Sequence, residues 1–116
     1  MSTLSGLTHL AIDDLSAVLV SAEPKAHYDE YTIKATYDLR SIEFKWPHRG
    51  AITLKEIIYC WLSCAAGAHL PMGEGFPEGM KAYLLDLKNR CLKEVMVLFD
   101  TNEQIQTYAA KVHALE

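Results

Sequence analysis

The order of hydrophobic and polar residues divides the chain near residue 50 into two parts with different periods. In residues 31–39, apolar and polar side chains alternate, which is the two-residue period of a β-strand with one buried face. The next apolar residues fall on even instead of odd positions: Ile42, Phe44 and Trp46. A turn or a β-bulge within residues 38–41 would reset the phase in this way. We favour the turn, because Asp38 suits the start of a type I turn and one uninterrupted strand would be long.

The first thirty residues allow two interpretations. Apolar segments on both sides of Asp13 and Asp14 are typical of a β-hairpin, whereas a helical stripe is also compatible with residues 5–22. That stripe consists of Leu7, Leu10, Ala11, Leu15, Val18, Leu19 and Ala22. The β-branched residues of the segment favour strands, so we expect an N-terminal antiparallel sheet of three to four strands, arranged as a meander.

After residue 50 the pattern becomes helical. Thr53 and Glu56 have the spacing of a capping box, and Ile52 and Ile57 occupy the positions of a hydrophobic staple, so a helix is expected from Thr53 to about residues 67–69. Further helices are expected over residues 77–99, opening near Pro77, and over residues 102–115, capped by Asp100 or Thr101. The buried stripe of the last helix consists of Ile105, Tyr108, Ala109, Val112 and Leu115. The sequence therefore predicts one α+β domain over residues 1–116, with three C-terminal helices packed on one face of the sheet.

Composition narrows the class of protein. Half of the 116 residues are hydrophobic and 22% are charged, which is typical of a folded globular domain. A net charge of −4 disfavours nucleic acid as a partner, because nucleic-acid binding uses a basic surface. The start of the chain lacks the pattern of a signal peptide, and no apolar stretch approaches the length of a membrane span. We therefore expect a cytoplasmic protein that does not contact a membrane.

Cys60 and Cys64 lie one helical turn apart, with His69 just beyond, and this spacing raises the question of a metal or redox site. A structural zinc site needs four ligands, and a redox pair usually has the spacing Cys-x-x-Cys. Neither pattern is present, so we expect these thiols to pack in the core and the protein to hold no metal or other cofactor. A reactive or sensing thiol is the alternative.

Two segments could bind ligands or partners. In residues 45–50, an aromatic side chain lies among cationic groups that could hold a phosphate, although Glu56 and the capping box oppose an anion there. A small-molecule pocket between sheet and helices would be lined by Trp46, Trp61, Tyr31, Tyr37 and His69. Together the two ideas give as ligand-binding candidates Trp46, His48, Arg49, Trp61 and His69. The glycine-rich residues 67–79 either tuck onto the core or offer three apolar side chains to a partner, namely Leu70, Met72 and Phe76.

The helix expected over residues 77–99 has a second apolar stripe, formed by Leu85, Leu92, Met96 and Phe99. This stripe either packs against the last helix or forms a homodimer interface, and we favour the homodimer. The sequence contains no phosphate-binding glycine motif, zinc-protease motif or nucleophile elbow. The leading hypothesis is thus a non-enzymatic protein-interaction module that engages its partner through the glycine-rich loop or the sheet face. The alternative is a small-molecule-binding protein, with or without weak catalytic activity.

Overall fold

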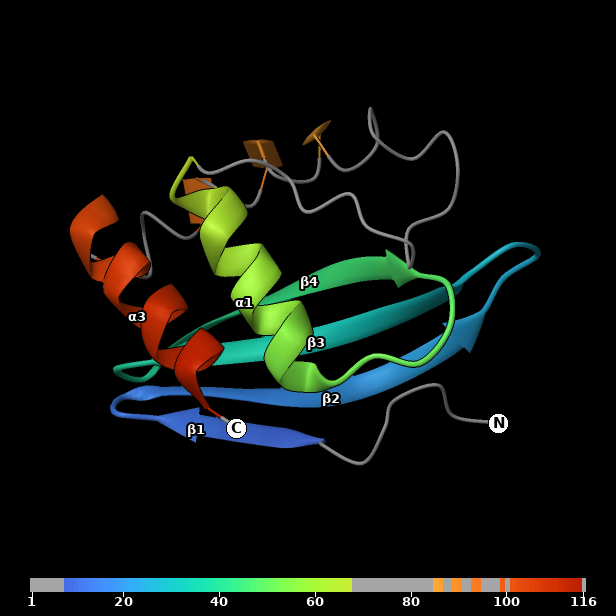
Figure 1. Cartoon of the computed structure of the whole chain (residues 1–116), viewed down its shortest axis with the longest axis horizontal. Helices are drawn as coiled ribbons and strands as arrows, with labels where there is room; N and C mark the ends of the chain where they lie inside the picture. Colours follow the sequence, from blue (N-terminus) through green and yellow to red (C-terminus); the bar gives the residue numbers. More distant parts are fainter. Residues whose placement is uncertain are drawn as a thin grey trace.

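The computed structural model of the chain describes residues 8–67, 85–86, 89–90, 93–94, 99 and 101–115. Its N-terminal part is a four-stranded antiparallel sheet in which neighbours along the chain are also neighbours in space (Figure 1). The strands are β1 (His9–Ile12), β2 (Leu15–Pro24), β3 (Asp29–Tyr37) and β4 (Arg40–His48). The predicted antiparallel meander is confirmed, and residues 9–22 form strands rather than a helix.

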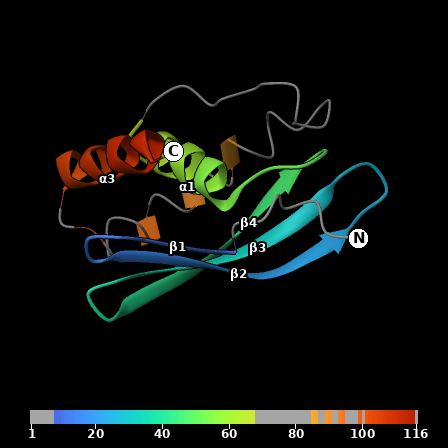
Figure 2. The ribbon, with the colours of Figure 1, turned by 60° about the horizontal axis from the view of Figure 1, so that its bottom comes forward.

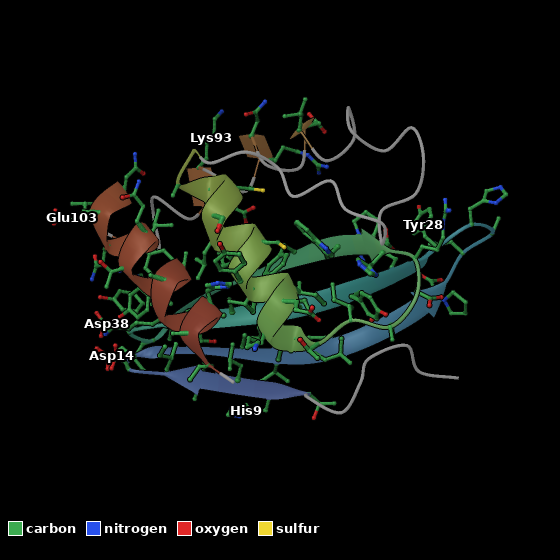
Figure 3. All side chains as sticks on the ribbon, in the orientation of Figure 1. His9, Asp14, Tyr28, Asp38, Lys93 and Glu103 are labelled. Atoms are coloured by element: carbon green, nitrogen blue, oxygen red, sulfur yellow. The ribbon has the colours of Figure 1, made fainter. Side chains whose placement is uncertain are left out.

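The phase change after β3 arises from a tight turn, as predicted, but the turn is of another type. Tyr37 pairs with Arg40, and both residues between them have positive φ, +51° at Asp38 and +69° at Leu39. Two left-handed residues give the primed hairpin turn, whose twist matches that of the flanking strands better than a type I turn does. The β1–β2 turn lies at the same end of the sheet, as the labels of Asp14 and Asp38 show in Figure 3. A β-bulge does occur, but in β2, between Leu19 and Ser21.

The first helix, α1 (Leu54–Ala65), begins where the sequence predicted. The Thr53 hydroxyl accepts a hydrogen bond from the Glu56 amide at 3.2 Å, and the Glu56 carboxylate accepts one from the Thr53 amide at 2.9 Å. The capping box is therefore complete. The helix ends slightly before the expected range, because Gly67 follows with φ of +92°, the left-handed conformation that commonly terminates a helix.

The second helix element is α3 (Asn102–Ala114), which Thr101 caps by accepting from the Gln104 amide at 3.2 Å. Two helices are thus seen, not the three that were predicted. Most of residues 77–99 lies outside the described part of the chain, although residues 85–86, 89–90 and 93–94 have helical backbone. Asp86 and Arg90 form an ion pair of 3.1 Å at the i, i+4 spacing of a helix.

Both α1 and α3 cover the same face of the sheet (Figure 2). Every second residue of the strands points to that face and packs against the buried residues of the helices. For example, Phe44 of β4 stacks on Trp61 of α1, with ring centroids 4.3 Å apart. In α3, Ile105, Tyr108, Ala109 and Val112 are buried as predicted, but Leu115 lies at the end of the helix and is 36% exposed. No helix within the described ranges is long and apolar enough to cross a membrane.

Candidate functional site

Two tryptophans that the sequence suggested as ligand-binding residues lie in the core. Trp46 and Trp61 are each 2% exposed, and the space around Trp61 is taken up by Phe44 and other core side chains. Trp61 Nε1 is buried and has no hydrogen-bond partner among the residues that the structure describes. A ligand could reach either indole only by displacing core neighbours, so these two residues serve packing first.

The connection between β4 and α1 gathers polar groups around one backbone carbonyl. The Gly50 oxygen accepts a hydrogen bond from the Tyr31 hydroxyl at 3.4 Å and lies 3.3 Å from His48 Nδ1. Burial lowers the pKa of His48, since the charged imidazolium is poorly solvated there, and burial raises the pKa of Tyr31 to about 12. Both side chains are therefore neutral near pH 7 and hold the connection in place.

The same connection is a poor anion site. Arg49 is exposed, whereas the Trp46 side chain is buried in the core and does not lie beside Arg49. The Glu56 carboxylate occupies the helix N-terminus, and its hydrogen bond from the Thr53 amide lowers its pKa, so it remains charged. The aromatic and cationic side chains of residues 45–50 therefore do not surround one position at which an anion could bind.

The residues expected to bind a partner are only partly described. Leu70, Met72, Phe76, Leu92 and Met96 lie outside the described residues, and so does the ligand-binding candidate His69. Leu85 is 40% exposed, which is compatible with an interface. Phe99 is fully buried between Tyr37 and Tyr108, at centroid distances of 5.0 and 5.4 Å, so it belongs to the core and not to an exposed stripe.

The two described cysteines lie where the helical periodicity placed them. Cys64 is buried and Cys60 is half-buried at the edge of the core. Burial raises the pKa of the Cys60 thiol to about 12, which disfavours the thiolate that metal binding or redox chemistry requires. Within the described ranges, no three potential metal-ligating side chains come together.

Sequence reasoning missed a groove of about 400 Å³ that is lined by residues of α1 and α3. Its lining consists of Tyr59, Ser63, Ala66, Gly67, Gln106, Ala109 and Ala110. None of these side chains is charged, and most are small. Tyr59 stands at one side and stacks on His113 of α3, with ring centroids 4.4 Å apart.

The groove exists because two helices pack with small residues facing each other. α1 and α3 run antiparallel, since Lys55 near the start of α1 donates to the carbonyl of Leu115 at the end of α3. Tyr59 and Ser63 lie on the partly exposed side of α1, outside its buried stripe. Which helix would lie beside them is a tertiary fact, and no local signal in either segment encodes it.

Comparisons with known proteins identify no relative of this chain: no family model matches it, and no curated protein or solved structure shows significant similarity.

Proposed function

We propose that this chain is a non-enzymatic protein-interaction module that binds an uncharged, apolar segment of a partner protein in the groove between α1 and α3. The observation that carries the proposal is the chemistry of the lining, in which none of seven residues bears a charge. Elsewhere the described helix surfaces carry charged groups such as Lys55, Glu103 and Lys111. Small residues at the floor let a partner's side chains or backbone approach closely, as in helix-in-groove recognition.

A protein segment suits this groove better than a small molecule does. Pockets for small ligands usually enclose most of the ligand surface, whereas this groove is more open than an enclosed cavity. Among the described lining residues there is no paired nucleophile and base: Ser63 is the only one of them with an aliphatic hydroxyl, and none is His, Asp or Glu. A binding role therefore accounts for the groove without a reaction.

One observation favours small-molecule binding as the second candidate. The volume of about 400 Å³ falls within the range of ligand pockets, roughly 300–1,000 Å³. Tyr59, Ser63 and Gln106 supply the few polar groups that such a ligand would need for orientation.

The surfaces suggested by the sequence stay predictions. The glycine-rich loop falls almost entirely outside the described residues. The sheet face opposite the helices is mostly polar, with Lys34 paired across strands with Glu43, and its exposed apolar residues on β2 are Val18 and Val20. A solvated face has this composition too, so the groove is the more specific candidate.

The test uses a photo-crosslinking amino acid at Gln106, which lines the groove, in extracts of the source cells. The matched control places the same amino acid at Thr107, an exposed neighbour on α3 outside the groove. We expect one protein to crosslink at position 106 and not at 107, and the purified pair to bind in calorimetry. The substitution Ala110→Arg puts a charge into the groove at an exposed site and should abolish that binding while the circular dichroism spectrum is unchanged.

Equal crosslinking at both positions, or binding unaffected by Ala110→Arg, would contradict the proposal. Native mass spectrometry separates the second candidate: a small ligand retained by the purified protein and lost from the Ala110→Arg variant would favour small-molecule binding instead.

A further inference from the structure

Strand β4 forms one edge of the sheet. It pairs with β3 on one side, and no described strand lies on its other side (Figure 1). An edge strand presents unpaired backbone N–H and C=O groups, so it can accept a further strand in the same sheet. At nine residues, β4 is much longer than the opposite edge strand, β1, which has four.

The hairpin register determines which residues of β4 direct their backbone groups outward. Tyr37 and Arg40 flank the two-residue turn, so they are the pair that exchanges hydrogen bonds across it. Because bonded and non-bonded pairs alternate in an antiparallel ladder, the even-numbered residues of β4 bond to β3. The outward residues are therefore Ser41, Glu43, Lys45 and Pro47. Proline has no N–H to donate, so its outward backbone position costs β4 no hydrogen bond to β3. Pro47 itself is buried, whereas Ser41, Glu43 and Lys45 are exposed and form the open part of the edge.

The charges on β4 select one way of pairing with a second copy. In an antiparallel two-fold arrangement, outward residues must pair with outward residues, and three such registers, centred on residues 43, 44 and 45, keep most of each nine-residue strand paired. One register places Glu43 opposite Glu43 of the second copy, and another places Lys45 opposite Lys45. Both oppose like charges, which destabilises strand pairing. The third places Phe44 on the two-fold axis and brings Glu43 opposite Lys45 twice.

We propose that two copies of this chain associate through β4 in this third register and form one continuous antiparallel sheet. Each Glu43–Lys45 pair then exchanges two backbone hydrogen bonds and adds an ion pair on the face away from the helices. On the helix-covered face, Ile42 of one copy meets Trp46 of the other, so apolar residues continue across the axis. The inference is independent of the groove between α1 and α3 and of the stripe in residues 77–99.

Lys45 is able to serve in such a pair. Its ammonium group lies 3.9 Å from the Glu30 carboxylate and 3.3 Å from the Thr32 hydroxyl, but its side chain is 55% exposed. Glu30 also lies 3.9 Å from the Lys25 ammonium group, so it keeps a cationic partner when the Lys45 side chain turns toward a second copy. Charged residues and proline on an edge strand also protect against pairing, and a chain protected in that way would remain monomeric.

The test measures the monomer–dimer equilibrium of the full chain by analytical ultracentrifugation. We expect Glu43→Lys and Lys45→Glu each to raise the dissociation constant roughly tenfold, since each turns two attractive contacts into repulsive ones. The double substitution Glu43→Lys with Lys45→Glu should return the constant close to the wild-type value. Glu103→Lys on α3 changes the net charge equally and should have no effect.

Within one copy, the double variant places a lysine at position 43 beside its strand partner Lys34, and a glutamate at position 45 beside Glu30, so it restores no neighbour on β3. Positions 43 and 45 of the same strand do regain opposite charges, but this contact is present in monomer and dimer alike and cancels in the dissociation constant. Rescue of the dissociation constant therefore reports contacts between copies. A second measurement is the hydrogen exchange of the Glu43 and Lys45 amides, which should slow as the protein concentration rises, while the Ile42 amide does not change. A monomer at all concentrations, or a dimer that neither single substitution weakens, would overturn the proposal.

Discussion

The β3–β4 turn holds a leucine in a backbone conformation that leucine rarely adopts, and replacing it should stabilise the protein. Leu39 has φ of +69° and is 98% exposed, so its side chain buries almost no surface that a substitution could lose. A left-handed conformation costs a residue with a Cβ atom about 1–2 kcal/mol. Glycine avoids that cost but loses more backbone entropy on folding, by about 0.5–1 kcal/mol. The net expectation for Leu39→Gly is a gain of about 0.5–1 kcal/mol in unfolding free energy.

Urea denaturation followed by circular dichroism can resolve this difference. With a slope of about 2 kcal/mol per molar urea, the midpoint should rise by roughly 0.3–0.5 M. Leu39→Ala is the matched control, because it removes the side chain but keeps the Cβ atom and therefore the backbone cost. All variants are compared at one protein concentration, since any self-association would shift the midpoint. If Leu39→Gly is no more stable than Leu39→Ala, the backbone conformation is not the source of the strain.

Three further predictions rest on α1 and the connection before it. Thr53→Ala removes the capping box and should cost about 1 kcal/mol of unfolding free energy, measured by the same denaturation. Cys60 should react with iodoacetamide at pH 8 roughly a thousandfold more slowly in the native state than in urea, because its partial burial raises the pKa of the thiol to about 12; equal rates would contradict this suppression of the thiolate. The lowered pKa of His48 means that the unfolded chain takes up a proton before the folded one. Stability should therefore fall as the pH drops below about 6.5, by at most about 1.4 kcal/mol per pH unit, and His48→Gln should flatten the curve in that window.

The sequence predicted those parts of the fold that depend on local or periodic signals. The alternation of apolar and polar residues in 31–39 identified β3, and the spacing of Thr53 and Glu56 identified the start of α1. Both signals depend only on residues close together in the sequence. The type of the β3–β4 turn was not predictable, since Leu39 has no preference for positive φ. Tertiary packing also overrode the interpretation of Phe99, which is buried against Tyr37 from a distant strand.

The candidate site was harder to predict than the fold. Trp46 and Trp61 looked like ligand-binding residues because aromatic side chains often line pockets, but the same chemistry serves a core, and packing decides between the two. The groove depends on Ser63 of α1 and Ala110 of α3 being neighbours, and nothing in either helix specifies the other.

The contacts of α3 have a consequence for the order in which the newly synthesised chain can fold. Gln104 donates to the Tyr37 hydroxyl across 67 residues, and Lys111 pairs with Asp13 across 98 residues. The strands of the sheet leave the ribosome first. The buried residues of α3 can pack against the apolar face of the sheet only after most of the chain has emerged. During this interval β2 and β3 expose residues such as Leu15 and Ile33, which are fully covered in the folded state. The sheet is therefore exposed to aggregation until α3 has emerged, and slow synthesis of residues 68–114 would lengthen that period.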